Sequence, residues 1–221
     1  MASDSLVPFQ AARSNTLLYQ DAFVRKCHAL IAQGYSRLNA PSLRTAQEPA
    51  ITGELVKEIK NLLQNDDAPQ WMVHFYLADD PPQNAPGRFG KSRRRVDIEF
   101  ERGGRRGVRP RLHFEAKRLY RAGSVSDYLG DEGLGLFITG EYAAMEDIGG
   151  MIGYVQLDQP VTWVKKVRDG LTSDPVRFGF RTPPGLVPTM FNLGLQSTHS
   201  SHHDRSAVGR PISIYHSFLQ F

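Results

Sequence analysis

Apolar side chains recur at helical spacing in the first third of the chain. Residues 15–33 place them every three or four positions, and Gly34 follows where a helix C-cap would lie. Residues 47–65 do the same, with a stripe formed by Ile51, Leu55, Ile59 and Leu62. Apolar residues spaced in this way line one face of a helix and pack it against a core. Both segments are therefore predicted to be amphipathic helices.

Alternating patterns dominate the middle of the chain. Residues 71–80 suggest a strand, and the stretches 96–101 and 111–117 alternate strictly around a turn that is rich in Gly and Arg. Folding this hairpin about Arg106 sets Asp97 opposite Glu115, Glu99 opposite His113, Glu101 opposite Arg111 and Arg95 opposite Lys117. One face of the hairpin is then apolar, with Val96, Ile98, Phe100, Leu112, Phe114 and Ala116. The other face carries the charged residues.

The remaining segments complete an alternation of helices and strands. A helix is predicted at 124–144, although it contains Gly133 and Gly135, followed by a strand at 149–157 and a helix at 161–171. Strands are also expected at 191–200 and 212–221. This order predicts an α/β or α+β fold with helices packed on a central mixed β-sheet. We expect a single domain over 1–221, with its core at about 45–171 and the strands of 172–221 packed on or extending it.

Composition narrows the class of protein. The chain has 221 residues, 40% of them apolar, which is enough for a sizeable core. A single cysteine, Cys27, excludes a disulfide framework and a cysteine-based zinc cluster. No run of about 18 apolar residues and no secretory signal is visible. The expected location is the cytoplasm, without membrane attachment.

Basic charge is concentrated around the hairpin. Residues 88–111 hold ten Lys or Arg against three acids, a local net charge of +7 in a chain whose total is +4. A local basic patch of this kind favours a polyanionic partner such as DNA, and the alternative is a solvated basic loop. The arginines expected to contact backbone phosphate are Arg93, Arg94, Arg95, Arg105 and Arg106.

The charged face of the hairpin has the composition of a metal site. Opposed carboxylates such as Asp97 and Glu115 repel each other unless something compensates their charge. Mg²⁺, for which Mn²⁺ commonly substitutes, prefers oxygen ligands and is often held by one or two carboxylates, waters and a substrate phosphate. Lys117, two residues after Glu115, would then orient water or stabilise developing charge. The alternative is an exposed ladder of the pairs Glu101–Arg111 and Arg95–Glu115, which would contribute little to stability.

The pattern Asp97 … Glu115-Ala116-Lys117 resembles the signature of the PD-(D/E)XK, or restriction-endonuclease-like, nuclease superfamily. The resemblance covers about residues 45–157, with Val96 in the position that proline most often occupies in that family. It implies an antiparallel strand pair that presents the acids and the lysine, a preceding helix that often supplies another acid, and a following helix. It also implies Mg²⁺-dependent hydrolysis of DNA phosphodiesters, often by a homodimer or with a partner subunit that supplies specificity.

Two residues are candidates for the upstream acid. Taking Leu55 as the centre of the buried stripe, Glu48 lies about 20° and Glu54 about 100° from it. Glu48 is therefore the favoured residue, with a role in catalysis and metal binding, and Glu54 remains open. An acid near a helix N-terminus is also favoured simply by the helix dipole.

The histidines leave further possibilities open. A His-rich turn that spans 199–205 suits a metal site, a phosphate contact or a solvated loop, and His113 suits either a hydrogen-bonded structural role or an auxiliary base. For the whole protein, the expected function is a metal-dependent nuclease in defence against foreign DNA or in repair. The alternatives are a non-catalytic nucleic-acid-binding or assembly subunit and a purely structural protein.

Overall fold

The computed structural model describes residues 7–83, 88–103, 109–180, 185–189, 191, 194–195 and 197–221, and for residues 7–18 the backbone alone. Its helices are α1 (Val7–Ser36), α2 (Ala40–Leu43), α3 (Glu48–Leu63), α4 (Ser124–Leu129), α5 (Leu134–Ile138) and α6 (Pro160–Ser173), with short 3₁₀ turns η1 (Gln70–His74) and η2 (Gly90–Ser92). Its strands are β1 (Phe75–Asp79), β2 (Ile98–Arg102), β3 (Arg111–Leu119), β4 (Ile148–Val155), β5 (Val187–Pro188), β6 (Thr198–His203) and β7 (Ile212–Gln220).

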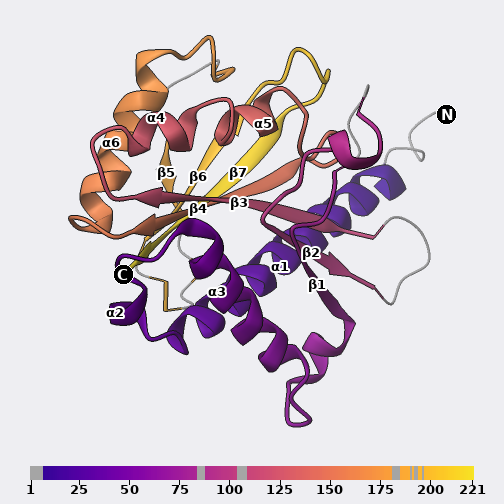
Figure 1. Cartoon of the computed structure of the whole chain (residues 1–221). Helices are drawn as coiled ribbons and strands as arrows, with labels where there is room; N and C mark the ends of the chain where they lie inside the picture. The colour runs from indigo at the N-terminus through magenta and orange to yellow at the C-terminus, as the bar shows by residue number, and fades with distance from the viewer. Residues whose placement is uncertain are drawn as a thin grey trace, which may run out of the picture.

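The described strands form one seven-stranded mixed sheet in the order β1-β2-β3-β4-β7-β6-β5 (Figure 1). The first three strands are antiparallel, whereas β3, β4 and β7 run parallel to one another. Parallel neighbours need a crossover connection, and α4 and α5 provide the one between β3 and β4. The predicted class, a mixed sheet flanked by helices, is confirmed, and the C-terminal strands extend this same sheet.

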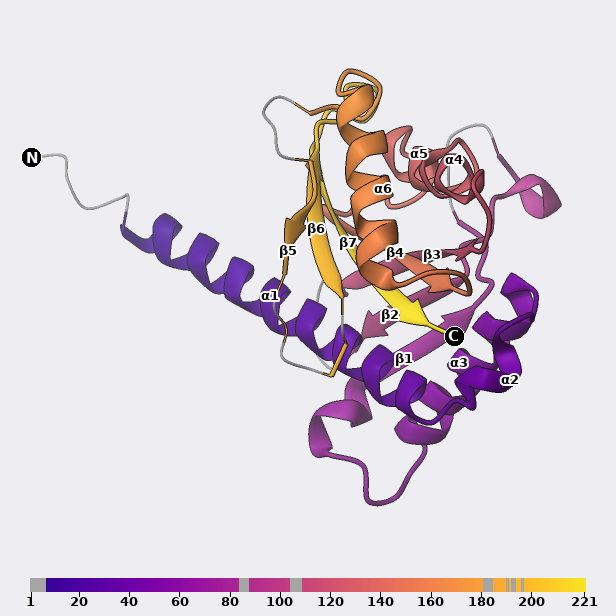
Figure 2. The same ribbon diagram turned by 90° about the vertical axis from the view of Figure 1, so that its left-hand side faces the viewer.

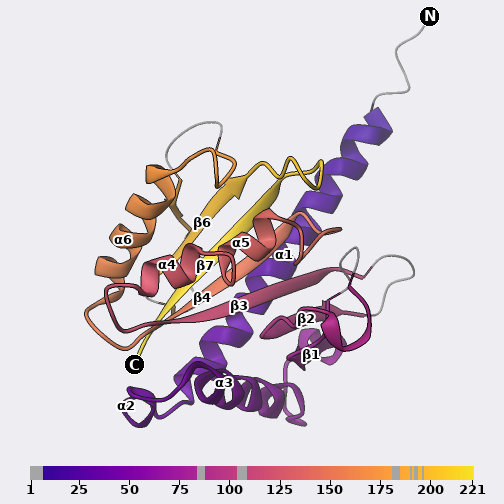
Figure 3. The ribbon, with the colours of Figure 1, turned by 45° about the horizontal axis from the view of Figure 1, so that its top comes forward.

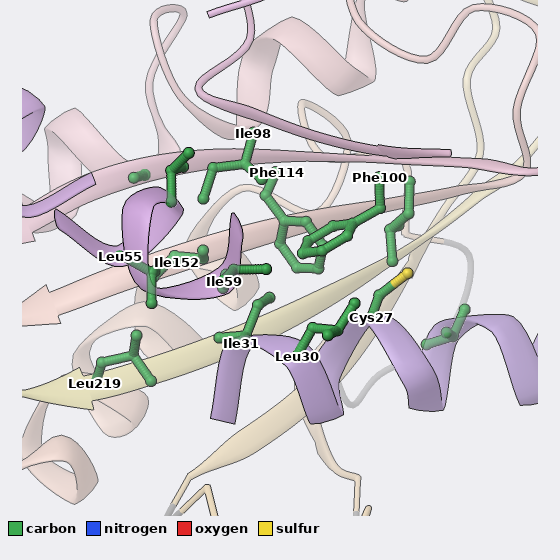
Figure 4. Close-up of a cluster of buried hydrophobic side chains, with 14 of the residues drawn as sticks. Cys27, Leu30, Ile31, Leu55, Ile59, Ile98, Phe100, Phe114, Ile152 and Leu219 are labelled. Atoms are coloured by element: carbon green, nitrogen blue, oxygen red, sulfur yellow. The ribbon is translucent and has the colours of Figure 1, made fainter. Parts of the chain in front are cut away.

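Helices cover both faces of the sheet (Figures 2 and 3). On one face, α1 and α3 bury the predicted stripes against β2, β3 and β4; Figure 4 shows Leu30, Leu55 and Phe114 in this cluster. On the other face, α4, α5 and α6 pack around Trp163 and Phe137. Both clusters include side chains of β4, so this strand is covered on both faces and buried along its whole length.

Glycines in β4 make room for the aromatic core. A Cβ added to Gly150 would lie 2.2 Å from the ring of Phe114. We expect Gly150→Ala to lower the free energy of unfolding by about 1–3 kcal/mol, the usual cost of overpacking a core. Gly53, on the exposed side of α3, has no atom within 4 Å of such a Cβ, so Gly53→Ala should leave stability unchanged or raise it. Urea unfolding of both variants tests this, and similar losses in the two would contradict it.

Three predicted elements differ from the structure. The strand expected at 191–200 begins only at Thr198 and continues to His203 as β6. The strand expected at 71–80 begins only at Phe75, because Gln70–His74 form a 3₁₀ turn after Pro69. The helix expected at 124–144 is instead two short helices separated at 130–133. A Cβ at Gly133 would lie 2.4 Å from the carbonyl oxygen of Tyr128, so the tight turn between α4 and α5 requires glycine there.

The hairpin register is as predicted over its paired part. Glu99 lies opposite His113 and Glu101 opposite Arg111. The predicted pairing of Arg95 with Lys117 is wrong, because β2 begins only at Ile98 and Arg95 bridges to Pro82 instead. The same departure of the chain before β2 moves Val96 away from Ile98 and Phe100 into the cluster on the opposite face.

The longer helices carry charged or polar residues between their apolar positions. Within the described ranges, no helix is both long and apolar enough to cross a bilayer. In α1, the longest of the helices, the charged residues Arg25 and Lys26 interrupt the apolar positions.

Candidate active site

Three of the predicted site residues meet on the face of the sheet that α4 and α5 cover. Asp97 immediately precedes β2, and its Oδ2 accepts a hydrogen bond from the backbone N–H of Ala116 at 2.7 Å. Glu115 and Lys117 alternate with Ala116 along β3, and Lys117 Nζ donates to Glu115 Oε1 at 2.6 Å. The hydrogen bond to Ala116 fixes Asp97 beside the two β3 side chains.

Glu48 joins this group from the first residue of α3. Its Oε1 lies 3.4 Å from Lys117 Nζ, and its Oε2 accepts the backbone N–H of Arg118 at 3.1 Å. Glu54 instead points to solvent and pairs with Lys57 at 3.1 Å. The structure therefore brings Glu48, and not Glu54, to the hairpin, where Glu48 contacts the lysine and the strand backbone.

Sequence reasoning missed the residues that hold Glu48 in place. Arg118 Nη1 donates to Gln47 Oε1 at 2.6 Å, and Arg118 Nε donates to Gln156 Oε1 at 2.7 Å. Gln156 in turn donates to the backbone carbonyls of Leu43 and Ala46, which precede α3. These partners are 38 to 113 residues apart in the chain, so no local pattern identifies them.

Burial sets the electrostatics of the site. Desolvation, followed by the nearby charge of Asp97, raises the pKa of Glu115 to about 8. Desolvation also raises the pKa of Asp97 to about 6, against the hydrogen bond from Ala116. Burial lowers the pKa of Lys117, but the carboxylates of Glu115 and Glu48 together outweigh this and leave it raised. The site thus holds more acidic groups than its one lysine neutralises.

The carboxylates of the site include two potential ligands for Mg²⁺. Among the residues that the structure describes, no three His, Cys, Asp or Glu side chains are grouped closely enough to hold a metal ion by themselves. Glu115 Oε2, however, is buried and has no hydrogen-bond partner in the described chain. Since Mg²⁺ usually keeps several waters and takes only one or two carboxylates from the protein, Asp97 and Glu115 fit it.

The predicted phosphate-contacting arginines have varied surroundings. Arg94 pairs with Glu132 at 2.7 Å and Glu141 at 3.1 Å, and Arg95 pairs with Asp80 at 2.6 Å. Arg93 donates from Nε to the carbonyl of Gly90. Arg105 and Arg106 lie outside the described residues. The basic segment is therefore partly neutralised by acids of its own and neighbouring loops.

The alternative charge ladder exists only at the far end of the hairpin. Glu101 accepts hydrogen bonds from Arg109 at 2.8 Å and Arg111 at 3.0 Å. The other expected pair, Arg95 with Glu115, does not form, because Arg95 is engaged with Asp80 and Glu115 with Lys117. The Glu115 side chain is only 8% exposed, which is not the setting of a surface ion pair.

The segment expected to be a His-rich turn is mostly strand β6. Ser201 bonds to His203 at 2.6 Å and to His216 of β7 at 2.8 Å, and His216 bonds to Tyr128 at 2.9 Å. His203 and His216 are fully buried, and desolvation lowers the pKa of both. A solvated loop is therefore wrong for these residues, which form a neutral hydrogen-bonded network that joins β6, β7 and α4.

Comparisons with known proteins do not add to this picture. No family model, no curated protein and no solved structure matches the chain. What the site does is therefore inferred from its own side chains and their positions.

Proposed function

We propose that this protein is an Mg²⁺-dependent nuclease that hydrolyses DNA phosphodiester bonds. The observation that carries the proposal is that Glu48, Asp97, Glu115 and Lys117 meet around the part of β3 that β2 leaves unpaired, with Glu115 Oε2 buried and not hydrogen-bonded in the described chain. A site with surplus buried carboxylate and one lysine suits a divalent cation together with an anionic substrate.

The carboxylates and the lysine have separate roles in this proposal. Asp97 and Glu115 would hold Mg²⁺, which polarises a phosphate oxygen and lowers the pKa of bound water. Lys117 is held between Glu115 and Glu48, so its ammonium group is positioned to orient the attacking water or to stabilise the charge that develops on phosphate. Glu48 is a positioning residue, since it fixes both Lys117 and the β3 backbone at Arg118.

The arrangement of elements adds support. The order α3-β1-β2-β3-α4-…-β4 places a helix before the strand pair and another after the lysine strand, as the resemblance to PD-(D/E)XK nucleases implies. The helix also contributes an acid, Glu48, to the lysine. Cleavage of foreign DNA or repair, in the cytoplasm and by a homodimer or with a partner subunit, remains part of this proposal and rests on analogy of fold.

Glu115 gives a reason to prefer an enzyme over an inert nucleic-acid-binding subunit. Burying this carboxylate is costly, because Lys117 bonds only to Oε1 and the neighbouring phenol of Tyr142 donates its proton to the backbone carbonyl of Arg95. In a protein that only binds DNA, the burial of Glu115 would lower stability with no functional benefit. In an active site, the same buried carboxylate serves as a ligand for the metal ion.

The test combines metal binding with cleavage. Wild type should bind Mg²⁺ or Mn²⁺ in calorimetry and nick supercoiled plasmid, and EDTA should stop the nicking. The double variant Asp97→Ala/Glu115→Ala should lose both properties, whereas Glu54→Ala on exposed α3 should keep both. DNA binding without nicking in wild type would favour the inert subunit, and absence of both metal and DNA binding would favour a purely structural protein.

A further inference from the structure

A cavity of about 660 Å³ lies beside the candidate active site. Its lining includes His113, which is two residues from Glu115 on the same face of β3. Alternate strand residues are about 7 Å apart, so the cavity begins roughly one side-chain spacing from the catalytic carboxylate. Its size falls within the range of small-molecule sites.

The polar lining of this cavity includes the carboxylate acceptors Glu99 and Glu146 beside the donors of Gln83, His113, Arg109 and Arg111. Glu99 Oε2 accepts from His113 Nε2 at 2.7 Å and from Gln83 Nε2 at 3.3 Å. A carboxylate has about four acceptor positions, so these two donors leave capacity for a ligand. His113 is 2% exposed, and its Nδ1 is buried without a hydrogen-bond partner in the described chain. Because that nitrogen is enclosed, Glu99, with 17% of its side chain exposed, is the polar group of this pair that a ligand can reach.

The remaining lining distinguishes between ligand classes. Pro81, Pro82, Ala143, Ala144 and Met145 supply apolar walls, and Arg109 and Arg111 lie at the side of Glu101. Glu99 and Glu146 both line the cavity, and their charges would repel a phosphate group inside it. A flat, neutral ring that carries N–H donors satisfies both the walls and the acceptors.

We propose that this cavity is a subsite for an unpaired nucleobase with an exocyclic amino group, next to the phosphodiester that the active site cleaves. Glu99 accepts the amino hydrogens, as acidic side chains do from cytosine N4. Arg109 and Arg111 face the sugar–phosphate that enters with the base. The proposal deepens the proposed function, since it makes DNA with an unstacked base the preferred substrate.

Neutral nucleosides test the subsite without metal or cleavage. In EDTA, titration followed by the imidazole NMR signals of His113 should show deoxycytidine binding at least about tenfold more tightly than thymidine, which presents a carbonyl oxygen where cytosine has its amine. Glu99→Gln should reduce this preference to less than about threefold, because an amide both donates and accepts. Glu54→Gln is the matched control and should behave as wild type.

A second variant guards against misfolding of the first. Ala144→Leu adds an aliphatic group to a partly exposed wall, and it should weaken both nucleosides while leaving the Glu99–His113 pair intact. Equal affinity for the two nucleosides, no binding of either, or an unchanged preference in Glu99→Gln would overturn the subsite. Plasmid nicking by the same wild-type sample reports separately on the nuclease: nicking without nucleoside discrimination removes the subsite alone, and discrimination without nicking removes the nuclease alone.

Discussion

Lys117→Met is expected to lower the rate of Mg²⁺-dependent plasmid nicking by about 10²–10³-fold, the usual effect of removing one preorganised charge-stabilising group. Lys117 Nζ lies 2.6 Å from Glu115 and 3.4 Å from Glu48, so its position is fixed before substrate arrives. Mg²⁺ binding should persist in this variant or become tighter, because Glu115 loses the internal cation that competes for its oxygen. Calorimetry and nicking rates on the same sample measure the two effects.

Lys57→Met is the matched control for this experiment. Lys57 makes a comparable ion pair with Glu54, but on the exposed side of α3, and its loss should leave the nicking rate unchanged. A Lys117→Met protein that nicks within about threefold of wild type would show that the lysine only neutralises the site. Loss of Mg²⁺ binding in this variant would instead assign Lys117 to holding the carboxylates in place.

Glu115→Gln should make the metal-free protein more stable at pH 8 while abolishing nicking. The pKa of Glu115 is about 8 in the folded state against 4.5 for an ordinary glutamate, so the folded state retains a proton that the unfolded chain releases. The stability of wild type therefore falls as pH rises from about 4.5 to about 8. Each pKa unit corresponds to about 1.4 kcal/mol, and the gain on substitution is expected to be on the order of 2 kcal/mol once Lys117 has lost its partner.

Urea unfolding in EDTA measures this gain at two values of pH. The difference between Glu115→Gln and wild type should be small at pH 5 and large at pH 8, and comparing the two proteins cancels the buried histidines, which they share. Adding Mg²⁺ at pH 8 should stabilise wild type but not the variant, because a ligand stabilises only the state that binds it. A stability difference that does not grow with pH would mean that Glu115 is ionised in the folded protein without strain.

These two predictions share one physical basis. Carboxylates that a folded protein buries without full compensation cost stability, and a functional ligand or substrate recovers it. Glu101 illustrates the contrast on the neighbouring strand, since Arg109 and Arg111 lower its pKa and leave it without surplus charge. Glu115, with one lysine and an unpartnered buried oxygen in the described chain, does not have that compensation.

The sequence by itself determined the elements whose signals are local. The stripe on α3 and the alternation along β2 and β3 follow from side-chain periodicity, so the helix, the register of Glu99 with His113 and the shared face of Glu115 and Lys117 were predictable. The mixed sheet with helices on both faces followed from the order of these elements. Local patterns did not predict the break between α4 and α5. The chain turns there because Gly133 lies close to the carbonyl oxygen of Tyr128, and such a contact cannot be read from periodicity.

Only the tertiary structure decided which distant groups meet. Helical periodicity favoured Glu48 over Glu54 only weakly, and the contact of Glu48 with Lys117 settles which one reaches the hairpin, 69 residues along the chain. The loop between β1 and β2 takes Arg95 to Asp80 and Val96 to the opposite core, although strict alternation predicts otherwise. Burial of Ser201, His203 and His216 arises from the pairing of β6 with β7 and the packing of α4. Periodicity reports which face of an element a side chain occupies, whereas its partner and its pKa depend on what the rest of the chain packs against that face.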